Sequence, residues 1–320
     1  MHIGSLTTVF HTQSFREAAQ QIHQIGLQSV EIGTGGYFPK NHCDPKHLLS
    51  DKKALAKFQD ILAEFELDIS ALAIHGEPLH PDPDIADVYD QDFRDTCKLA
   101  AKIGVTRMTL LAGLPEAAPG DRVPNWILYP YPSQYIDMFE WQWEERLIPY
   151  WKEHGKIAED HGVRLCFEMH PGDMVFKPEG LIRLRDAVGK VVGCNLDPSH
   201  LFWQSMDVLE VIQILGDIIY HVHAKDSRLE DRNVRANGVL DAKTFQDHMN
   251  RSWMFRTVGY GHGEKFWRDF VSTLRMVGYD DVISIEHEDP LIDSEEGFEL
   301  AVRTLQNVVI RQPATTLWYE

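Results

Sequence analysis

The chain of 320 residues lacks features that would indicate a secreted, membrane-bound or zinc-finger protein. Its four cysteines (Cys43, Cys97, Cys166 and Cys194) lie far apart and form no C-x-x-C pair, so neither a disulfide framework nor a thiolate zinc site is expected. No run of 18 apolar residues occurs, and the first 15 residues lack the basic segment and apolar run of a secretory signal. We therefore expect a soluble, cytoplasmic protein that does not bind a membrane.

Positive charge is also scarce. Lysine and arginine together number 31 against 49 aspartates and glutamates, which gives a formal net charge of −18. No local cluster of basic residues interrupts this acidic balance, and such a chain repels the phosphate backbone of nucleic acids. We therefore expect no nucleic-acid partner.

Short strand-like runs alternate with helix-patterned segments along the whole chain. The eight runs are "HIGSLTTVF", "SVEIG", "LDISALAIHG", "VTRMTLLA", "VRLCFEMH", "VVGCNLD", "IIYHVHAKD" and "VISIEHED". Eight such units without a linker predict an α/β fold, a single (β/α)8 TIM-barrel domain over residues 1–320. A doubly wound sheet would need a glycine-rich phosphate loop, and "IGTGGYFPK" matches neither known pattern.

Three connections that follow strands are too long for simple turns. They follow the second, fourth and seventh strands and cover residues 34–50, 113–139 and 227–263. In a barrel these loops rise from the C-terminal face, where active sites are built. The second and third are rich in aromatic residues, so we expect them either to wall a pocket, with Trp126 as a substrate-binding residue, or to form a subunit interface.

Four consecutive strands end in residues that can bind a metal. These are Glu168 in "FEMHPG", Asp197 in "NLDPSH", His223 in "HVHAKD" and Glu286 in "SIEHED". Any one alone is explained as well by a cap, an ion pair or a core histidine. Acids that converge on one barrel mouth repel each other unless a cation lies among them. Three carboxylates and one imidazole favour a divalent ion, Mn²⁺ first, with Mg²⁺, Co²⁺ or Zn²⁺ as alternatives.

Further polar residues share the orientation of these ligands, because residues two positions apart on a strand face the same side. Candidates for catalysis or substrate binding near the ligands are His170, Lys225, His200 and, from an earlier strand, His75. Glu31, Glu77, Asn195 and Glu288 are further polar neighbours. His221 is expected deeper in the barrel, as a buried hydrogen-bonding partner.

The four motifs together resemble the xylose isomerase-like TIM barrel superfamily, often described as the sugar phosphate isomerase/epimerase family. The superfamily includes ketose 3-epimerases, inosose dehydratases and endonuclease IV-type enzymes, and the resemblance covers nearly the whole chain. It implies that Glu168, Asp197, His223 and Glu286 bind the metal and that His200 binds substrate. In the ketose 3-epimerases, the glutamates that match Glu168 and Glu286 are also the acid/base pair.

The chain departs from this pattern in two places. Glu286 follows His223 by 63 residues, so the seventh loop holds an insertion that must reshape the pocket. Leu229 stands where the epimerases have an arginine, six residues after the histidine ligand, and Arg228 or Arg256 is the candidate substitute for binding substrate. The extra Asp-x-His metal pair of the endonuclease branch has no match, which together with the negative charge argues against DNA repair.

The resulting hypothesis is a metal-dependent sugar isomerase or epimerase. A metal that chelates a carbonyl and a neighbouring hydroxyl stabilises an enediolate. Glu168 or Glu286 then removes the proton next to the carbonyl, and the other glutamate returns a proton. His170 and Lys225 are expected to hold hydroxyls or to transfer protons.

Two alternatives stay open. In a 3-oxo sugar the same proton abstraction expels a substituent, with His170 as a candidate base. That chemistry would make the protein a lyase or dehydratase, similar to inosose dehydratases or to the subunits that cleave 3-oxo-glycosides and C-glycosides. The other alternative is a barrel that binds a metal or sugar, or serves as a subunit, without turnover. The aromatic loops are compatible with a homodimer or a small accessory subunit.

Overall fold

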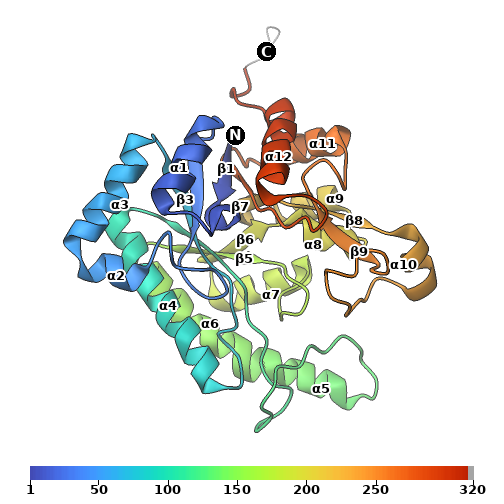
Figure 1. Cartoon of the computed structure of the whole chain (residues 1–320). Helices are drawn as coiled ribbons and strands as arrows, with labels where there is room; N and C mark the ends of the chain where they lie inside the picture. Colours follow the sequence, from blue (N-terminus) through green and yellow to red (C-terminus); the bar gives the residue numbers. More distant parts are fainter. Residues whose placement is uncertain (316–320) are drawn as a thin grey trace.

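Eight parallel strands form a closed barrel in the computed structural model, which describes residues 1–315 (Figure 1). Around the barrel the strands run in the order β1, β10, β7, β6, β5, β4, β3, β2 and back to β1. The predicted (β/α)8 barrel is therefore confirmed. The barrel strands are β1 (His2–Leu6), β2 (Ser29–Gly33), β3 (Asp68–Ile74), β4 (Arg107–Leu110), β5 (Arg164–Glu168), β6 (Val192–Leu196), β7 (Ile219–Ala224) and β10 (Val282–Ile285).

Helices surround the strands, and several begin at residues that suit a helix start. Ser14 and Glu17 form a capping box ahead of the first helix, and Asp207 and Asp293 cap two later ones. The first run was expected to stay extended to Phe10, but residues 7–10 form a 3₁₀ turn. The α-helices are α1 (Phe15–Gln24), α2 (Pro45–Ser50), α3 (Lys52–Glu64), α4 (Pro83–Ile103), α5 (Gln134–Trp141), α6 (Ile148–Asp160), α7 (Pro178–Val188), α8 (Pro198–Trp203), α9 (Val208–Leu215), α10 (Asp231–Asn237), α11 (Glu264–Met276) and α12 (Ser294–Val308).

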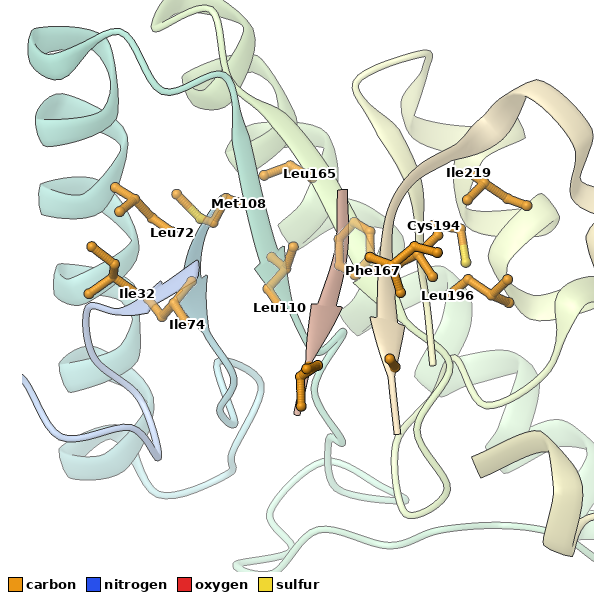
Figure 2. Packing of buried hydrophobic residues seen from close by; sticks show 14 of the residues in the cluster. Ile32, Leu72, Ile74, Met108, Leu110, Leu165, Phe167, Cys194, Leu196 and Ile219 are labelled. Carbon is orange, nitrogen blue, oxygen red and sulfur yellow. The ribbon is translucent and has the colours of Figure 1, made fainter. Parts of the chain in front are cut away.

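The hydrophobic core lies between the strands and the helices. The strands are buried on both faces, which is why they read as nearly continuous apolar runs in the sequence. Figure 2 shows part of this core, with Leu110, Phe167 and Leu196 among the labelled side chains of neighbouring strands. None of the helices in residues 1–315 is both long and apolar enough to cross a bilayer.

The long connection after β7 contains a small sheet of its own. Strand β8 (Asp226–Leu229) pairs antiparallel with β9 (Trp253–Arg256), and α10 lies between them in the chain. Figure 1 shows this insertion, in orange, projecting from one side of the barrel. The connection after β4 has no regular secondary structure from Leu111 until shortly before α5. These two segments stand beside the C-terminal ends of the barrel strands.

Candidate active site

Four residues from four neighbouring strands meet at the C-terminal end of the barrel. Glu168 is the last residue of β5, His223 lies in β7, and Asp197 and Glu286 directly follow β6 and β10. One ligand atom of each lies within 4.8 Å of the others, and all four side chains are buried. The structure thus brings together the four predicted metal ligands, which we call the quartet.

The ring of His223 is oriented by contacts on both of its nitrogens. Its Nδ1 lies 3.2 Å from Glu168 Oε2 and 2.9 Å from Glu286 Oε2, whereas its Nε2 lies 2.9 Å from Glu31 Oε2. When Nε2 carries the proton and donates it to Glu31, the lone pair of Nδ1 points toward the two glutamates. A carboxylate behind a histidine ligand in this way fixes its ring and raises its basicity.

Glu31 is itself held by a buried polar network inside the barrel. It accepts hydrogen bonds from Thr109 Oγ1 at 2.5 Å and from Ser284 Oγ at 2.8 Å. Although burial opposes its ionisation, His223 and His221 hold the pKa of Glu31 well below its usual value. Glu31 is therefore an anion that orients the ring of His223.

His221 and Asn195 extend this network below the quartet. His221 Nδ1 lies 2.9 Å from Asn195 Oδ1, and Asn195 Nδ2 donates to Glu168 Oε2 at 3.0 Å. Burial lowers the pKa of His221 to about 4, so the ring is neutral. The expectation that His221 is a buried hydrogen-bonding partner agrees with this geometry.

The quartet has the geometry and the free donor atoms that a divalent cation requires. Asp197 Oδ2 and Glu286 Oε2 are buried and accept no hydrogen bond from residues 1–315. Burial raises the pKa of Asp197 to about 6, and the Glu168 carboxylate adds to the rise. Ligand atoms of one ion stand about 2.0–2.6 Å from it, so they lie within about 5.2 Å of each other, as these four do. Three carboxylates and an imidazole therefore fit a hard divalent ion.

The glutamate oxygens that face away from His223 Nδ1 lie beside His200 and Lys225. Glu168 Oε1 lies 3.3 Å from His200 Nε2, and Glu286 Oε1 lies 3.1 Å from Lys225 Nζ. Lys225 also contacts Glu288 Oε2 at 2.6 Å. Each glutamate thus presents one oxygen to the centre of the quartet. The other oxygen of Glu286 is held by Lys225, whereas the other oxygen of Glu168 lies beside His200 Nε2, which makes no hydrogen bond to residues 1–315.

A cavity of about 720 Å³ opens above the quartet. Seven of the residues predicted to bind substrate or take part in catalysis line it, namely the two glutamates Glu168 and Glu286 together with His75, Trp126, His170, His200 and Lys225. Burial, with a smaller contribution from His200, lowers the pKa of His170 to about 3, so this ring is neutral at neutral pH.

Arg256 is the predicted substrate-binding residue that the structure does not bring into the cavity. Its Nε donates to Asp289 Oδ2 at 3.1 Å, and the same oxygen accepts the Thr257 backbone N–H. The other candidate, Arg228, pairs with Glu230. Neither arginine is among the residues that line the cavity, so neither replaces the missing epimerase arginine there.

Several aromatic residues that form the cavity wall had no individual role predicted from the sequence. Trp203 of α8 stacks on Trp253 of β9 with ring centroids 4.6 Å apart, and Phe245 stacks on Phe255 at 5.4 Å. The aromatic composition of the loops gave a general signal for a wall, and the run "NRSWMF" contains two of its members, Trp253 and Phe255.

Curated relatives match along much or all of the chain. The Bacillus subtilis protein YfiH is 37% identical over 313 residues, which cover 97% of this chain and 99% of YfiH. An inosose dehydratase of Bacillus licheniformis is 27% identical over 184 residues, covering 57% of this chain and 58% of the relative.

Solved structures of similar fold match at low identity. The probable 3-DHS dehydratase AsbF of Bacillus anthracis superposes with a TM-score of 0.67 at 15% identity, covering 96% of this chain and 99% of AsbF. The IOLI protein with a bound zinc atom superposes with a TM-score of 0.64 at 18% sequence identity, covering 97% of this chain and 98% of the IOLI protein. A D-psicose 3-epimerase solved with D-fructose superposes with a TM-score of 0.62 at 13% sequence identity, covering 97% of this chain and 99% of the epimerase.

The family model described as "Xylose isomerase-like TIM barrel" matches residues 19–308. That range contains all four members of the quartet together with Glu31 and Lys225. The chain therefore belongs to the xylose isomerase-like TIM barrel family.

Proposed function

We propose that the protein is a divalent-metal-dependent sugar isomerase or epimerase that moves a proton next to the carbonyl of a keto sugar or related polyol. One observation carries the proposal. Two buried glutamates and two further ligands converge within 4.8 Å beneath a cavity large enough for a sugar. A site that combines free carboxylates, a fixed imidazole and a cavity suits proton abstraction.

Glu168, Asp197, His223 and Glu286 would hold the cation, for which Mn²⁺ is our first expectation and Mg²⁺, Co²⁺ and Zn²⁺ are alternatives. When bound, the ion supplies Lewis-acid stabilisation of the negative charge that develops on the substrate oxygens. Glu31 keeps the imidazole of His223 turned so that Nδ1 faces this position.

The two glutamates are the acid/base pair in this proposal. One of them takes the proton from the carbon beside the carbonyl, and the other returns a proton to the opposite face or to the neighbouring carbon. Lys225 holds the outer oxygen of Glu286, and His200 lies 3.3 Å from the outer oxygen of Glu168. His75 and His170 line the cavity and can hold substrate hydroxyls.

A lyase or dehydratase is the second candidate, and Lys225 is the observation that favours it. Its ammonium group is almost fully buried and lines the cavity, where it can donate a proton to a leaving oxygen after the first proton abstraction. The named relative from Bacillus licheniformis is an inosose dehydratase. Both reactions begin with removal of the same proton, so they differ only in the steps after that removal.

Proton NMR of substrates recovered from D₂O separates these functions. The Mn²⁺-treated protein would be incubated with free ketoses and, in parallel, with 3-oxo-glucosides. Deuterium at the carbon beside the ketose carbonyl supports the isomerase or epimerase. Loss of a substituent from the 3-oxo sugar, with ketoses unchanged, supports the lyase. If a broad ketose and 3-oxo sugar panel shows neither change, the proposal of an enzyme acting on keto sugars is wrong.

A further inference from the structure

The cavity has more room than a single sugar ring needs. A hexose has about twelve non-hydrogen atoms, and even if each took a water molecule's share of about 30 Å³, it would fill at most about half of the 720 Å³. The remaining volume must be occupied by solvent or by a second part of the substrate. The chemistry of the walls distinguishes between these occupants.

The wall above the quartet is largely apolar, and much of it comes from the two insertions. Trp253, Phe255 and Phe245 belong to the connection after β7, whereas Trp126 and Leu128 belong to the connection after β4. Trp253 already stacks on Trp203, and Phe245 already stacks on Phe255, so an apolar ligand group would pack against the surfaces of these rings that remain free. An aromatic wall of this size is poorly suited to water alone.

This wall also lacks the charge that a phosphate group would need. Among the described residues that line the cavity there is no arginine, and Lys225 is the single lysine. The ammonium group of Lys225 is already shared by Glu286 and Glu288. Phosphate recognition normally uses arginine forks, free lysines or a row of backbone N–H groups. A sugar phosphate therefore finds no matched partner here.

Asp241, an acid in the part of the wall formed by the seventh insertion, is neutralised by its own surroundings. Asp241 lines the cavity, but its Oδ1 pairs with Lys243 at 2.8 Å and its Oδ2 accepts the Ser252 N–H at 2.7 Å. A charged substituent of either sign thus gains little from this part of the cavity. The wall is suited to a neutral group.

The seventh insertion is anchored in place, so the wall exists before a ligand binds. The buried carboxylate of Asp226 accepts the backbone N–H groups of Gly259, Gly261 and His262 at 2.9–3.1 Å. A Cβ on Gly261 would come within 2.4 Å of Asp226 Oδ1, so the close approach requires glycine. A preformed wall costs little ordering on binding.

From these observations we propose that the cavity takes an unphosphorylated sugar that carries an apolar, aryl-type substituent. The sugar lies over the quartet and the substituent lies against Trp253, Phe255 and Phe245. The proposal rests on the proposed function for the placement of the sugar, but the recognition of the substituent is a binding property that can be measured without turnover.

The test is calorimetric titration of the Mn²⁺-treated full chain with three unreactive probes: phenyl β-D-glucoside, methyl β-D-glucoside and glucose 6-phosphate. We expect the phenyl glucoside to bind roughly tenfold more tightly than the methyl glucoside, because the phenyl ring buries apolar surface against the wall. Glucose 6-phosphate should bind no better than the methyl glucoside.

Two variants locate the effect. Phe245→Ala should remove most of the preference for the phenyl glucoside and leave the affinity for the methyl glucoside unchanged. Met249→Ala is the matched control, since Met249 lies in the same insertion at 83% exposure and does not line the cavity. Leu128→Ala, in the other insertion, is a second variant in case Phe245→Ala fails to fold.

The proposal is overturned if the phenyl and methyl glucosides bind equally, if neither binds, or if glucose 6-phosphate binds best. It is also overturned if Phe245→Ala and Leu128→Ala, both folded, keep the full preference. The proposed function fails on a different result, namely no deuterium exchange and no elimination with any keto sugar. The two failures can therefore be told apart.

Discussion

The floor and the wall of the cavity are built in opposite ways. The floor consists of the quartet and Glu31, whose side chains lie on or just after barrel strands and are at most 8% exposed. The wall consists of aromatic and aliphatic side chains from two insertions, and several stay largely exposed, such as Phe245 at 42% and Leu128 at 44%. The barrel strands thus position the charged groups of the proposed active site, while the insertions form the wall against which we propose that the substrate packs.

A change in the floor should have the largest effect. Glu168→Gln removes one anionic ligand and one of the two proposed bases, so we expect loss of metal retention and a fall in activity of about 10²–10⁴-fold or more. The measurements are Mn²⁺ retained after gel filtration and deuterium exchange into substrate. Glu159→Gln is the control, because Glu159 lies on the exposed face of α6 and does not line the cavity. Full activity in Glu168→Gln would refute the site.

The second prediction tests whether Glu31, which lies below the four ligands, supports metal binding. Glu31→Gln keeps the size of the side chain but weakens the contact that orients His223. We expect Mn²⁺ affinity to fall about 10–100-fold, the usual cost of losing such a partner. Titration calorimetry gives the affinity, and Glu159→Gln on the exposed face of α6 serves as the control. An unchanged affinity would mean that Glu31 has only a structural role.

The third prediction, His170→Asn, tests whether a residue between the floor and the wall affects turnover without holding the metal. His170 lines the cavity but lies outside the quartet, so the metal should be retained while turnover falls by roughly a hundredfold. Metal content and kcat measured on the same preparation check this. Loss of the metal would place His170 among the ligands instead.

The smallest effect should come from the wall. Trp126→Phe keeps an aromatic ring but removes contact area and an indole N–H that has no partner among residues 1–315. We expect KM to rise by about two- to fivefold with kcat unchanged, since the contact is equally strong before and during the reaction. A large fall in kcat would show that the wall also shapes the chemistry.

The sequence predicted the barrel and the floor well because both depend on local patterns. Glu168 and Asp197 stand at the ends of apolar runs, and parallel strands bring such ends together at one face. The role of Glu31 was not predicted, because its partner His223 is 192 residues away and the contact forms only when β2 and β7 face each other inside the closed barrel.

The wall was predicted only in outline. The aromatic composition of the loops indicated a pocket, but nothing local in residues 227–263 fixes the β8–β9 hairpin or the stacking of Trp203 on Trp253. Arg256 shows the difficulty most clearly. Its side chain belongs to the insertion, yet the fold of that insertion turns it to Asp289 and away from the cavity.

The most direct test of the quartet as a metal site is anomalous diffraction from a crystal of the full chain grown with Mn²⁺. We predict one strong peak about 2.0–2.6 Å from a carboxylate oxygen of Glu168, Asp197 and Glu286 and from Nδ1 of His223, with Nε2 still bonded to Glu31. Absence of a peak among these residues at saturating Mn²⁺, or a metal bound elsewhere in the cavity, would contradict the assignment of the quartet.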